Sequence, residues 1–271
     1  MTSETGRPAP AEPRLIQGVN WMGVWTLFLK EVRRFVKVGT QTVAAPAVTT
    51  LLFLAIFTLA LGREIELGAD VTFPEFLAPG LVMMAILQNA FQNTSSSLMI
   101  SKVQGNIVDV LMPPLGPGEL VTAYVAAGIV RGLVVGSSTT IVMSIVVGFE
   151  FANPLLALFF AIIGSMFLAL LGVLAGLWSE KFDHLSAVTN FLITPLTFLS
   201  GTFYSIDRLP GIWNEVAHLN PIFWLIDGFR AGMIGWSDSD PMIGAAVVLG
   251  LNCVLIAWAH QLLKRGYKLK A

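Results

Sequence analysis

Two otherwise apolar stretches of the chain carry clusters of uncharged amide and hydroxyl side chains. Residues three or four positions apart share one face of a helix, so these groups align in two rows. The rows are Asn89, Asn93 and Ser97 in the first stretch and Asn190, Thr194 and Thr197 in the second. Such groups either bond one membrane helix to another or line a path for water and substrate. We predict that both rows line a translocation path, with bonding between helices as the competing interpretation.

Other kinds of chemistry have little support. The cores of the apolar stretches contain no Asp or Glu, and Arg131 and His260 are their ionisable groups, both assigned to the inner halves. This argues against a proton-coupled carrier and against an intramembrane protease. The sequence has no G-x-x-x-x-G-K-[ST] phosphate loop and, with one cysteine and three scattered histidines, no metal-ligand spacing. We therefore predict no catalytic, metal or cofactor site in this chain.

Composition places the protein in lipid. Of 271 residues, 55% are hydrophobic and 12% are charged, and the mean hydropathy is +0.75. A soluble domain carries about 25% charged residues, so this chain could not cover a water-facing surface. The net charge of −1 offers no basic excess for nucleic acid.

About 20 apolar residues cross a bilayer as a helix. Six uncharged runs approach that length, and the third continues a helix that begins near Glu119: 38–62, 76–101, 132–149, 151–179, 185–206 and 241–263. The predicted fold is therefore an all-α integral membrane protein with six transmembrane helices. If the N-terminus is cytoplasmic, all but three of the 16 Lys and Arg residues fall on the inner side. The positive-inside rule favours this topology, which places both termini in the cytoplasm.

Three further segments are predicted outside the spans. Residues 1–19 are typical of a disordered tail, and residues 20–37 of an amphipathic helix at the membrane surface. That helix would act either as a topological anchor or as a contact for a partner, and it leads into a six-helix domain over 38–271. The inner connection 102–118 contains a short helical piece, 106–112, followed by a Gly-Pro-Gly turn. Its apolar residues need a cover, supplied by a cytoplasmic partner or by the inner helix ends.

The long outer segment 207–240 contains two helical pieces, 210–219 and 221–234. Trp213 and other aromatic residues favour the membrane interface. We predict a re-entrant hairpin that enters the outer leaflet without crossing it. Asp227 and Arg230 lie three residues apart and are expected to pair on one face.

Three stretches resemble the type-2 ABC transporter permeases. They are ITPLTFLSGTFYSIDRLP (193–210), AHLNPIFWLIDGFRAGMIG (217–235) and, in the inner connection, DVLMPPLGPGELVTAY (109–124). The resemblance extends over nearly the whole chain, and bacterial multidrug permeases and exporters of nodulation oligosaccharides look most similar.

The resemblance implies a permease subunit in a bacterial inner membrane, which pairs with a second copy of itself. Two separate ATPase subunits would hold ATP and Mg²⁺ and would dock on the inner connection, which includes Asn106, Asp109, Leu111, Met112 and Leu115. The family places its cavity between the second and fifth spans of both copies, and its substrates are amphipathic drugs, lipids, glycolipids or polysaccharides. The alternative is a membrane channel or scaffold protein that works without ATP.

Overall fold

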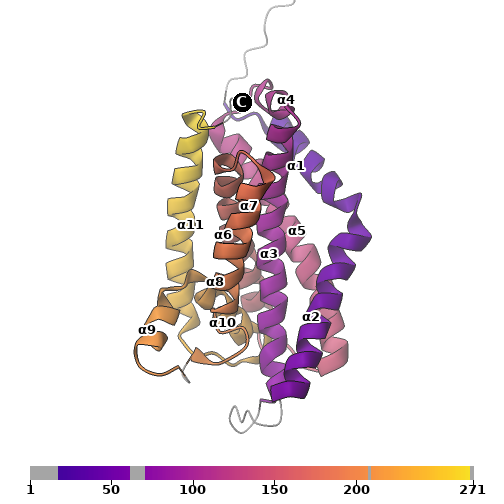
Figure 1. Cartoon of the computed structure of the whole chain (residues 1–271), viewed down its shortest axis with the longest axis vertical. Coiled ribbons are helices and arrows are strands. Elements are labelled where there is room, and N and C mark those ends of the chain that lie inside the picture. The colour runs from indigo at the N-terminus through magenta and orange to yellow at the C-terminus, as the bar shows by residue number, and fades with distance from the viewer. Residues whose placement is uncertain (1–17, 62–70, 207–208, 269–271) are drawn as a thin grey trace, which may run out of the picture.

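The structure, a computed structural model, describes residues 18–61, 71–206 and 209–268, and the elements within those ranges are helices. The predicted tail, 1–19, lies almost entirely outside them. The long helices stand side by side along the longest axis of the molecule (Figure 1). The elements are α1 (Trp21–Val36), α2 (Gly39–Leu61), α3 (Phe73–Val103), α4 (Ile107–Leu111), α5 (Pro117–Val147), α6 (Pro154–Trp178), α7 (Phe182–Val188), the π-helix η1 (Thr189–Ile193), α8 (Thr194–Phe198), α9 (Ile212–Leu219), α10 (Pro221–Ile234) and α11 (Pro241–Lys264).

Local sequence sets several helix starts. Helices α6, α10 and α11 each begin at a proline directly after an Asn or Asp whose side chain accepts a hydrogen bond from a backbone N–H in the first turn. A proline at the first position fits because its missing N–H would have no partner within the helix. Gly116 and Pro117 also begin a helix, α5. The predicted Gly-Pro-Gly turn is therefore wrong beyond Gly116.

Within the described ranges, four helices are long and apolar enough to cross a membrane: residues 39–60 of α2, then α5, α6 and α11. Helix α3 has 31 residues, which is length enough to span, but it carries the amide cluster. The predicted fifth span is short and interrupted, since α7, η1 and α8 follow one another over 182–198. Six crossings therefore remain a prediction.

The fifth predicted span, 185–206, ends as a helix at Phe198. Pro195 has no N–H to continue the regular hydrogen-bond ladder, and the π-helix lies directly before it. Beyond Phe198 the chain turns at Gly201, whose φ is +72°. The hydroxyls of Ser200 and Thr202 both donate to the carbonyl of Thr197, which fixes this turn.

Helix α3 is the centre of the bundle, and it packs most extensively on α6 and α5. Small residues allow these helices to approach closely, as in other membrane helix pairs. A Cβ at Gly176 of α6 would lie 2.9 Å from Leu98 Cβ of α3, and one at Gly132 of α5 would lie 2.6 Å from Ser165 Oγ of α6. Thr94 of α3 also donates a hydrogen bond to the carbonyl of Ala169 at 2.8 Å.

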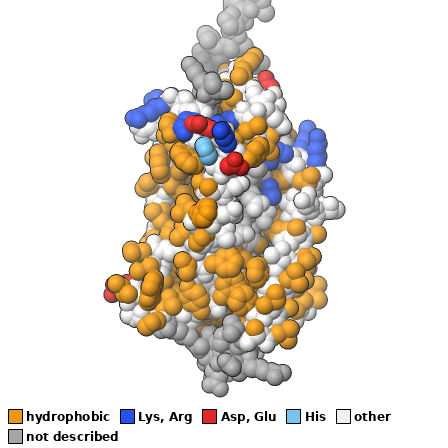
Figure 2. All heavy atoms as spheres, viewed as in Figure 1, with side chains coloured by type: hydrophobic (Ala, Val, Ile, Leu, Met, Phe, Trp, Pro, Cys, Tyr) orange, Lys and Arg blue, Asp and Glu red, His pale blue; other side chains and the backbone are white. Residues whose placement is uncertain are grey.

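Charged and apolar side chains occupy different parts of the surface. Hydrophobic side chains cover the sides and the lower part of the face in view, and Lys and Arg gather towards the upper part (Figure 2). The upper end is the one at which α4 lies, whereas α9 lies at the opposite end (Figure 1). We call these the α4 end and the α9 end. The distribution matches a bundle embedded in lipid whose basic end faces water.

The two helical pieces predicted near the α9 end are present as α9 and α10, but the predicted pairing of Asp227 with Arg230 is wrong. Both side chains are almost completely buried, with 1% of each exposed. Asp227 accepts hydrogen bonds from the backbone N–H groups of Asp238 and Ser239 at 2.8 and 3.0 Å. Arg230 does not pair with Asp227. Its guanidinium donates to backbone carbonyl groups of distant segments, which lie closer to it than the Asp227 carboxylate does.

Arg230 joins three parts of the chain. Its Nε donates to the carbonyl of Phe76 in α3 at 3.2 Å, and its Nη2 donates to the carbonyl of Gly201 at 2.8 Å. The guanidinium carbon lies 3.9 Å from the centre of the Phe76 ring. These contacts hold α10 against α3 and against the turn after α8, which makes Arg230 a structural cation.

Replacing this cation tests that role. Hydrogen bonds from a charged donor contribute about 1.5–3 kcal/mol each, so we expect Arg230→Met to lower the free energy of unfolding by at least about 2 kcal/mol. Thermal unfolding of the detergent-purified protein, followed by tryptophan fluorescence, measures the change. Arg33→Met removes an exposed guanidinium from α1 and serves as the control. Equal midpoints for the two variants would show that Arg230 does not hold the segment.

Candidate functional site

A polar cavity of about 850 Å³ lies between α2 and α3 and extends to α5 and α8. Polar groups from α2 face polar groups from α3 across it. Its polar lining residues are Gln41, Thr42, Thr49, Thr50, Gln88, Asn89, Gln92, Ser96, Arg131 and Thr194. The rest of the wall is apolar and includes Phe53 and Phe198. A mixed wall of this kind offers hydrogen bonds and an apolar surface to the same molecule.

The residues of the two predicted rows do not all reach this cavity. Asn89 and Thr194 line it. Asn93, Ser97 and Thr197 are buried between helices, with 0%, 3% and 0% of their surfaces exposed. Asn190 lies on an exposed surface of η1 and does not line the cavity. Within one copy of the chain, two residues of the rows therefore line the cavity, three pack between helices, and Asn190 does neither.

Helix α1 accounts for the burial of Asn93. Arg34 of α1 donates from Nη2 to Asn93 Oδ1 at 3.2 Å and from Nη1 to Ser96 Oγ at 3.2 Å. Its Nε pairs with Glu31, whose side chain is fully buried, at 3.0 Å. The predicted surface helix is thus fastened to the polar face of α3 by hydrogen bonds from Arg34, whose charge is balanced by Glu31 of the same helix. The sequence analysis did not identify Glu31. Its spacing of four residues from both Leu27 and Phe35 places its carboxylate on the buried apolar face of α1, and this spacing was visible in the sequence.

Arg131 of α5 also contacts the polar face of α3. It lies near the midpoint of its 31-residue helix, and its Nη2 donates to Asn89 Oδ1 at 3.1 Å. Its predicted location in the inner half of the membrane stays a prediction. Within the chain, Arg131 lines the cavity.

The polar face of α2 was also missed. Gln41, Thr42, Thr49 and Thr50 recur at intervals of seven and eight residues, which places them on one face. This spacing was visible in the sequence. Threonine hydroxyls in helices commonly bond to a carbonyl of the preceding turn, as Thr50 does to Pro46 at 2.9 Å, so they are easily taken as neutral packing residues.

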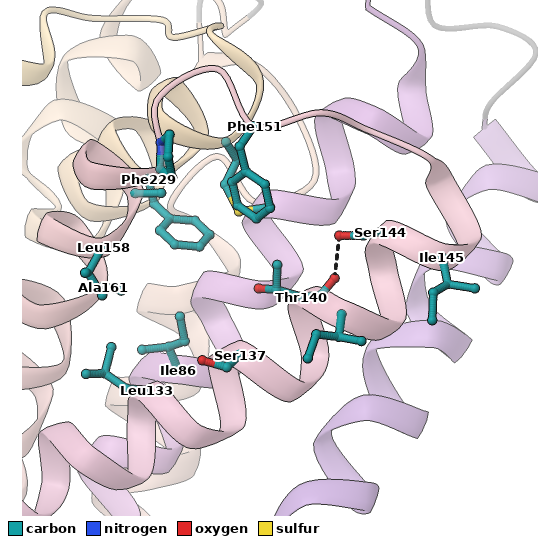
Figure 3. A pocket seen from close by; sticks show the side chains of 15 residues that line it. Ile86, Leu133, Ser137, Thr140, Ser144, Ile145, Phe151, Leu158, Ala161 and Phe229 are labelled. Atoms are coloured by element: carbon teal, nitrogen blue, oxygen red, sulfur yellow. Dashed lines mark hydrogen bonds between the residues drawn. The ribbon is translucent and has the colours of Figure 1, made fainter.

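A second hollow, of about 470 Å³, lies where α5, α6 and α10 meet. Its wall is mainly apolar, with Ile86, Leu158 and Phe229 around it, and Ser144 at its edge donates to the carbonyl of Thr140 at 2.8 Å (Figure 3). The described residues of this wall include no charged side chain. The cavity between α2 and α3 is therefore the better candidate for a functional site.

The connection between α3 and α5 divides its apolar residues between two environments. Helix α4 buries Ile107 and Val110 against the bundle, whereas Leu111 and Met112 are exposed by 39% and 76%. Asn106 and Asp109 are exposed, and Leu115 is half-buried. The helix ends thus cover one face of α4, whereas cover of its other face by a cytoplasmic partner stays a prediction.

Basic side chains complete the structure at the α4 end. Lys102 donates to the carbonyls of Gly176 and Leu177 at 3.2 and 2.8 Å, which satisfies groups at the C-terminal end of α6. Lys268 pairs with Glu180 at 2.7 Å. The hydrogen bond and positive charge of Lys268 lower the pKa of the Glu180 carboxyl, so this exposed pair stays ionised at neutral pH.

Comparison with known proteins decides the family. Residues 22–234 match the family model described as ABC-2 type transporter. The chain belongs to the ABC-2 type transporter family. It is 34% identical over 254 residues to the Escherichia coli K12 protein named inner membrane transport permease YadH, an alignment that covers 93% of this chain and 98% of that protein. Nodulation protein J of Rhizobium leguminosarum bv. viciae is 23% identical over 242 residues, covering 88% and 90% of the two chains.

These matches confirm the resemblance to type-2 ABC permeases. The ABC-2 chain is thus a multi-pass membrane transport subunit and is not itself catalytic.

Chemical modification can test whether water reaches the cavity between α2 and α3. Gln92 lines the cavity and is exposed, whereas the native Cys253 is exposed on the mainly apolar helix α11. A hydrophilic maleimide reacts with thiolates in water, so membrane vesicles carrying Gln92→Cys in a Cys253→Ala background should be modified. Wild-type Cys253 should stay unmodified because lipid surrounds it. Equal modification of the two, scored by mass spectrometry, would contradict a cavity distinct from the lipid face.

Proposed function

We propose that this chain is the membrane-spanning permease subunit of an ATP-binding-cassette exporter. It moves an amphipathic substrate, such as a drug, a lipid, a glycolipid or a polysaccharide, through the cavity between α2 and α3. A separate ATPase subunit supplies the energy. The observation that carries this proposal is a polar cavity of about 850 Å³ among apolar helices in a chain of the ABC-2 type transporter family.

The chemistry of the wall favours a bulky amphipathic substrate over a small ion. Gln88 and Gln92 offer uncharged hydrogen-bonding groups, and Phe53 and Phe198 offer aromatic faces. Ion pores use rings of charged side chains or of backbone carbonyls. The lining residues include neither arrangement among the side chains described, which weighs against the alternative of an ATP-independent channel.

The α4 end supplies the surface on which the ATPase docks. Val108, Leu111 and Met112 present apolar side chains there, with 54%, 39% and 76% exposure. Asp109 adds a charge beside them. A protein partner would remove these side chains from water, and the short helix α4 would transmit its movement to α3 and α5. ATP and Mg²⁺ are bound by that partner and not by this chain.

A second copy of the chain completes the path. The cavity is partly open. Within one copy of the chain, only 17% of the residues in the apolar stretch of α2 are buried. An isologous dimer would bring two identical faces together and enclose both cavities. Asn190, which is exposed in one copy, remains a candidate path residue in that assembly. Asn93, Ser97 and Thr197 would line the path only after a shift of the helices that bury them. Two ATPase subunits would then serve two permease chains.

The membrane orientation follows from charge. The α4 end carries the docking surface and, by the positive-inside rule, lies in the cytoplasm together with both termini. The α9 end, including Trp213 and the re-entrant pieces α9 and α10, faces outward. Because a relative is named an inner membrane permease, we assign this chain to a bacterial inner membrane.

Charge on the docking surface should weaken docking of the ATPase and thereby reduce transport. The double variant Leu111→Glu, Met112→Glu places two carboxylates on the open face of α4, where each burial against a partner would cost several kcal/mol. We expect transport in proteoliposomes to fall about tenfold or more while the permease still folds. Gln104→Glu adds one carboxylate at an exposed position next to α4 and should leave transport close to wild type. Unchanged transport in the double variant would exclude docking here.

The proposal as a whole is tested by reconstitution. The permease should co-purify with an ABC ATPase, and addition of a transported amphiphile should stimulate ATP hydrolysis by the complex. Passage of solute through the permease alone in liposomes, with no dependence on ATP, would instead support a channel.

A further inference from the structure

Arg131 is the only charged residue among those described around the cavity. An arginine near the middle of a membrane helix is costly, and such residues are normally paired with a carboxylate or have a functional task. No Asp or Glu of the described ranges lies within 4 Å of the Arg131 nitrogens. The cavity therefore holds a positive charge that the described side chains do not neutralise.

The surroundings of Arg131 explain why it points into the cavity. Its hydrogen bond to Asn89 Oδ1, at 3.1 Å, draws the guanidinium across to α3. Its Nε atom is buried and has no hydrogen-bond partner in the described part of the chain. An arginine held only for packing would be expected to satisfy its buried donors. This donor set is incomplete in one copy of the chain.

Arg34 differs from Arg131 in this respect. It reaches Asn93, one helical turn along α3 from Asn89, but it pairs with the buried carboxylate of Glu31. Its charge is thus balanced within α1. The net positive charge next to the cavity comes from Arg131, and the amides of Gln88, Asn89 and Gln92 surround it with further hydrogen-bonding groups.

We propose that the substrate of this permease carries an acidic group, a phosphate, sulfate or carboxylate, which Arg131 binds in the cavity while the apolar part of the substrate lies along Phe53, Met84 and Phe198. This inference rests on the proposed function and narrows its substrate class to anionic amphiphiles. A guanidinium suits the task because its planar set of donors matches the oxygens of these groups. The single positive charge of Arg131 favours substrates with one acidic group over cationic or neutral substrates.

Binding of simple amphiphiles tests the inference. The full-length permease, in nanodiscs, is titrated with a fluorescent dodecyl phosphate followed by polarisation. Unlabelled dodecyl phosphate should compete at least about tenfold better than dodecyltrimethylammonium or dodecyl maltoside, because a hydrogen bond between two charged groups is stronger than one to an uncharged group. Inorganic phosphate alone should compete weakly, since it lacks the apolar part, and competition equal to that of dodecyl phosphate would contradict an amphiphile site.

Two variants assign the selectivity to Arg131. Arg131→Gln should weaken dodecyl phosphate about tenfold or more and leave dodecyl maltoside unchanged. Asn89→Asp places a carboxylate beside the guanidinium and should abolish the preference for anions without removing Arg131. Arg33→Gln, which removes an exposed guanidinium of α1, is the matched control and should bind as the wild type does.

The outcomes separate this inference from the proposed function. Equal affinity of the wild type for dodecyl phosphate and dodecyl maltoside would overturn it, as would unchanged selectivity in both Arg131→Gln and Asn89→Asp. A parallel loss of both amphiphiles in Arg131→Gln would assign Arg131 a structural role and overturn it too. None of these results affects co-purification with the ATPase, which depends on the α4 end.

Discussion

The amide and hydroxyl side chains of α3 need polar partners, and the helices around α3 are arranged so that they supply them. A polar group left without a partner in an apolar interior costs about 1–3 kcal/mol, so each must meet another polar group or water. On one side Thr94 bonds to the backbone of α6, and towards α1 Asn93 and Ser96 receive the guanidinium of Arg34. The remaining amides, Gln88, Asn89 and Gln92, border a cavity with α2. The polar side chains of α3 thus account both for the packing of its neighbours and for the cavity.

Four cations show how position decides the role of a charge. Lys102 satisfies carbonyls at the end of α6, and Arg230 satisfies carbonyls of α3 and of the turn after α8. Arg34 is balanced by Glu31. Each of these three is bound to groups that hold helices together. Arg131 has one amide partner and borders open space, which is why the candidate chemistry gathers around it.

Much of the fold was predictable because its signals are local. The Asn-Pro and Asp-Pro pairs before α6, α10 and α11 mark helix starts, and uncharged runs mark most of the long helices. The site was less predictable because its contacts join distant segments. The three-residue spacing of Asp227 and Arg230 suggested a pair, yet backbone groups from 201 and 238–239 bind these side chains instead. Likewise, helical spacing aligned Asn93 with Asn89, but only the position of α1 shows that Arg34 covers Asn93.

The central claim is that the space between α2 and α3 is the path whose opening ATP controls. Pulsed electron resonance between spin labels at Thr49 and Gln92, which lie on the two walls, measures that opening directly in the reconstituted complex with its ATPase. We predict two distance distributions, one without nucleotide and another when ATP and vanadate trap the ATPase. One distribution that is unchanged by nucleotide, in a complex that hydrolyses ATP and transports, would contradict the account.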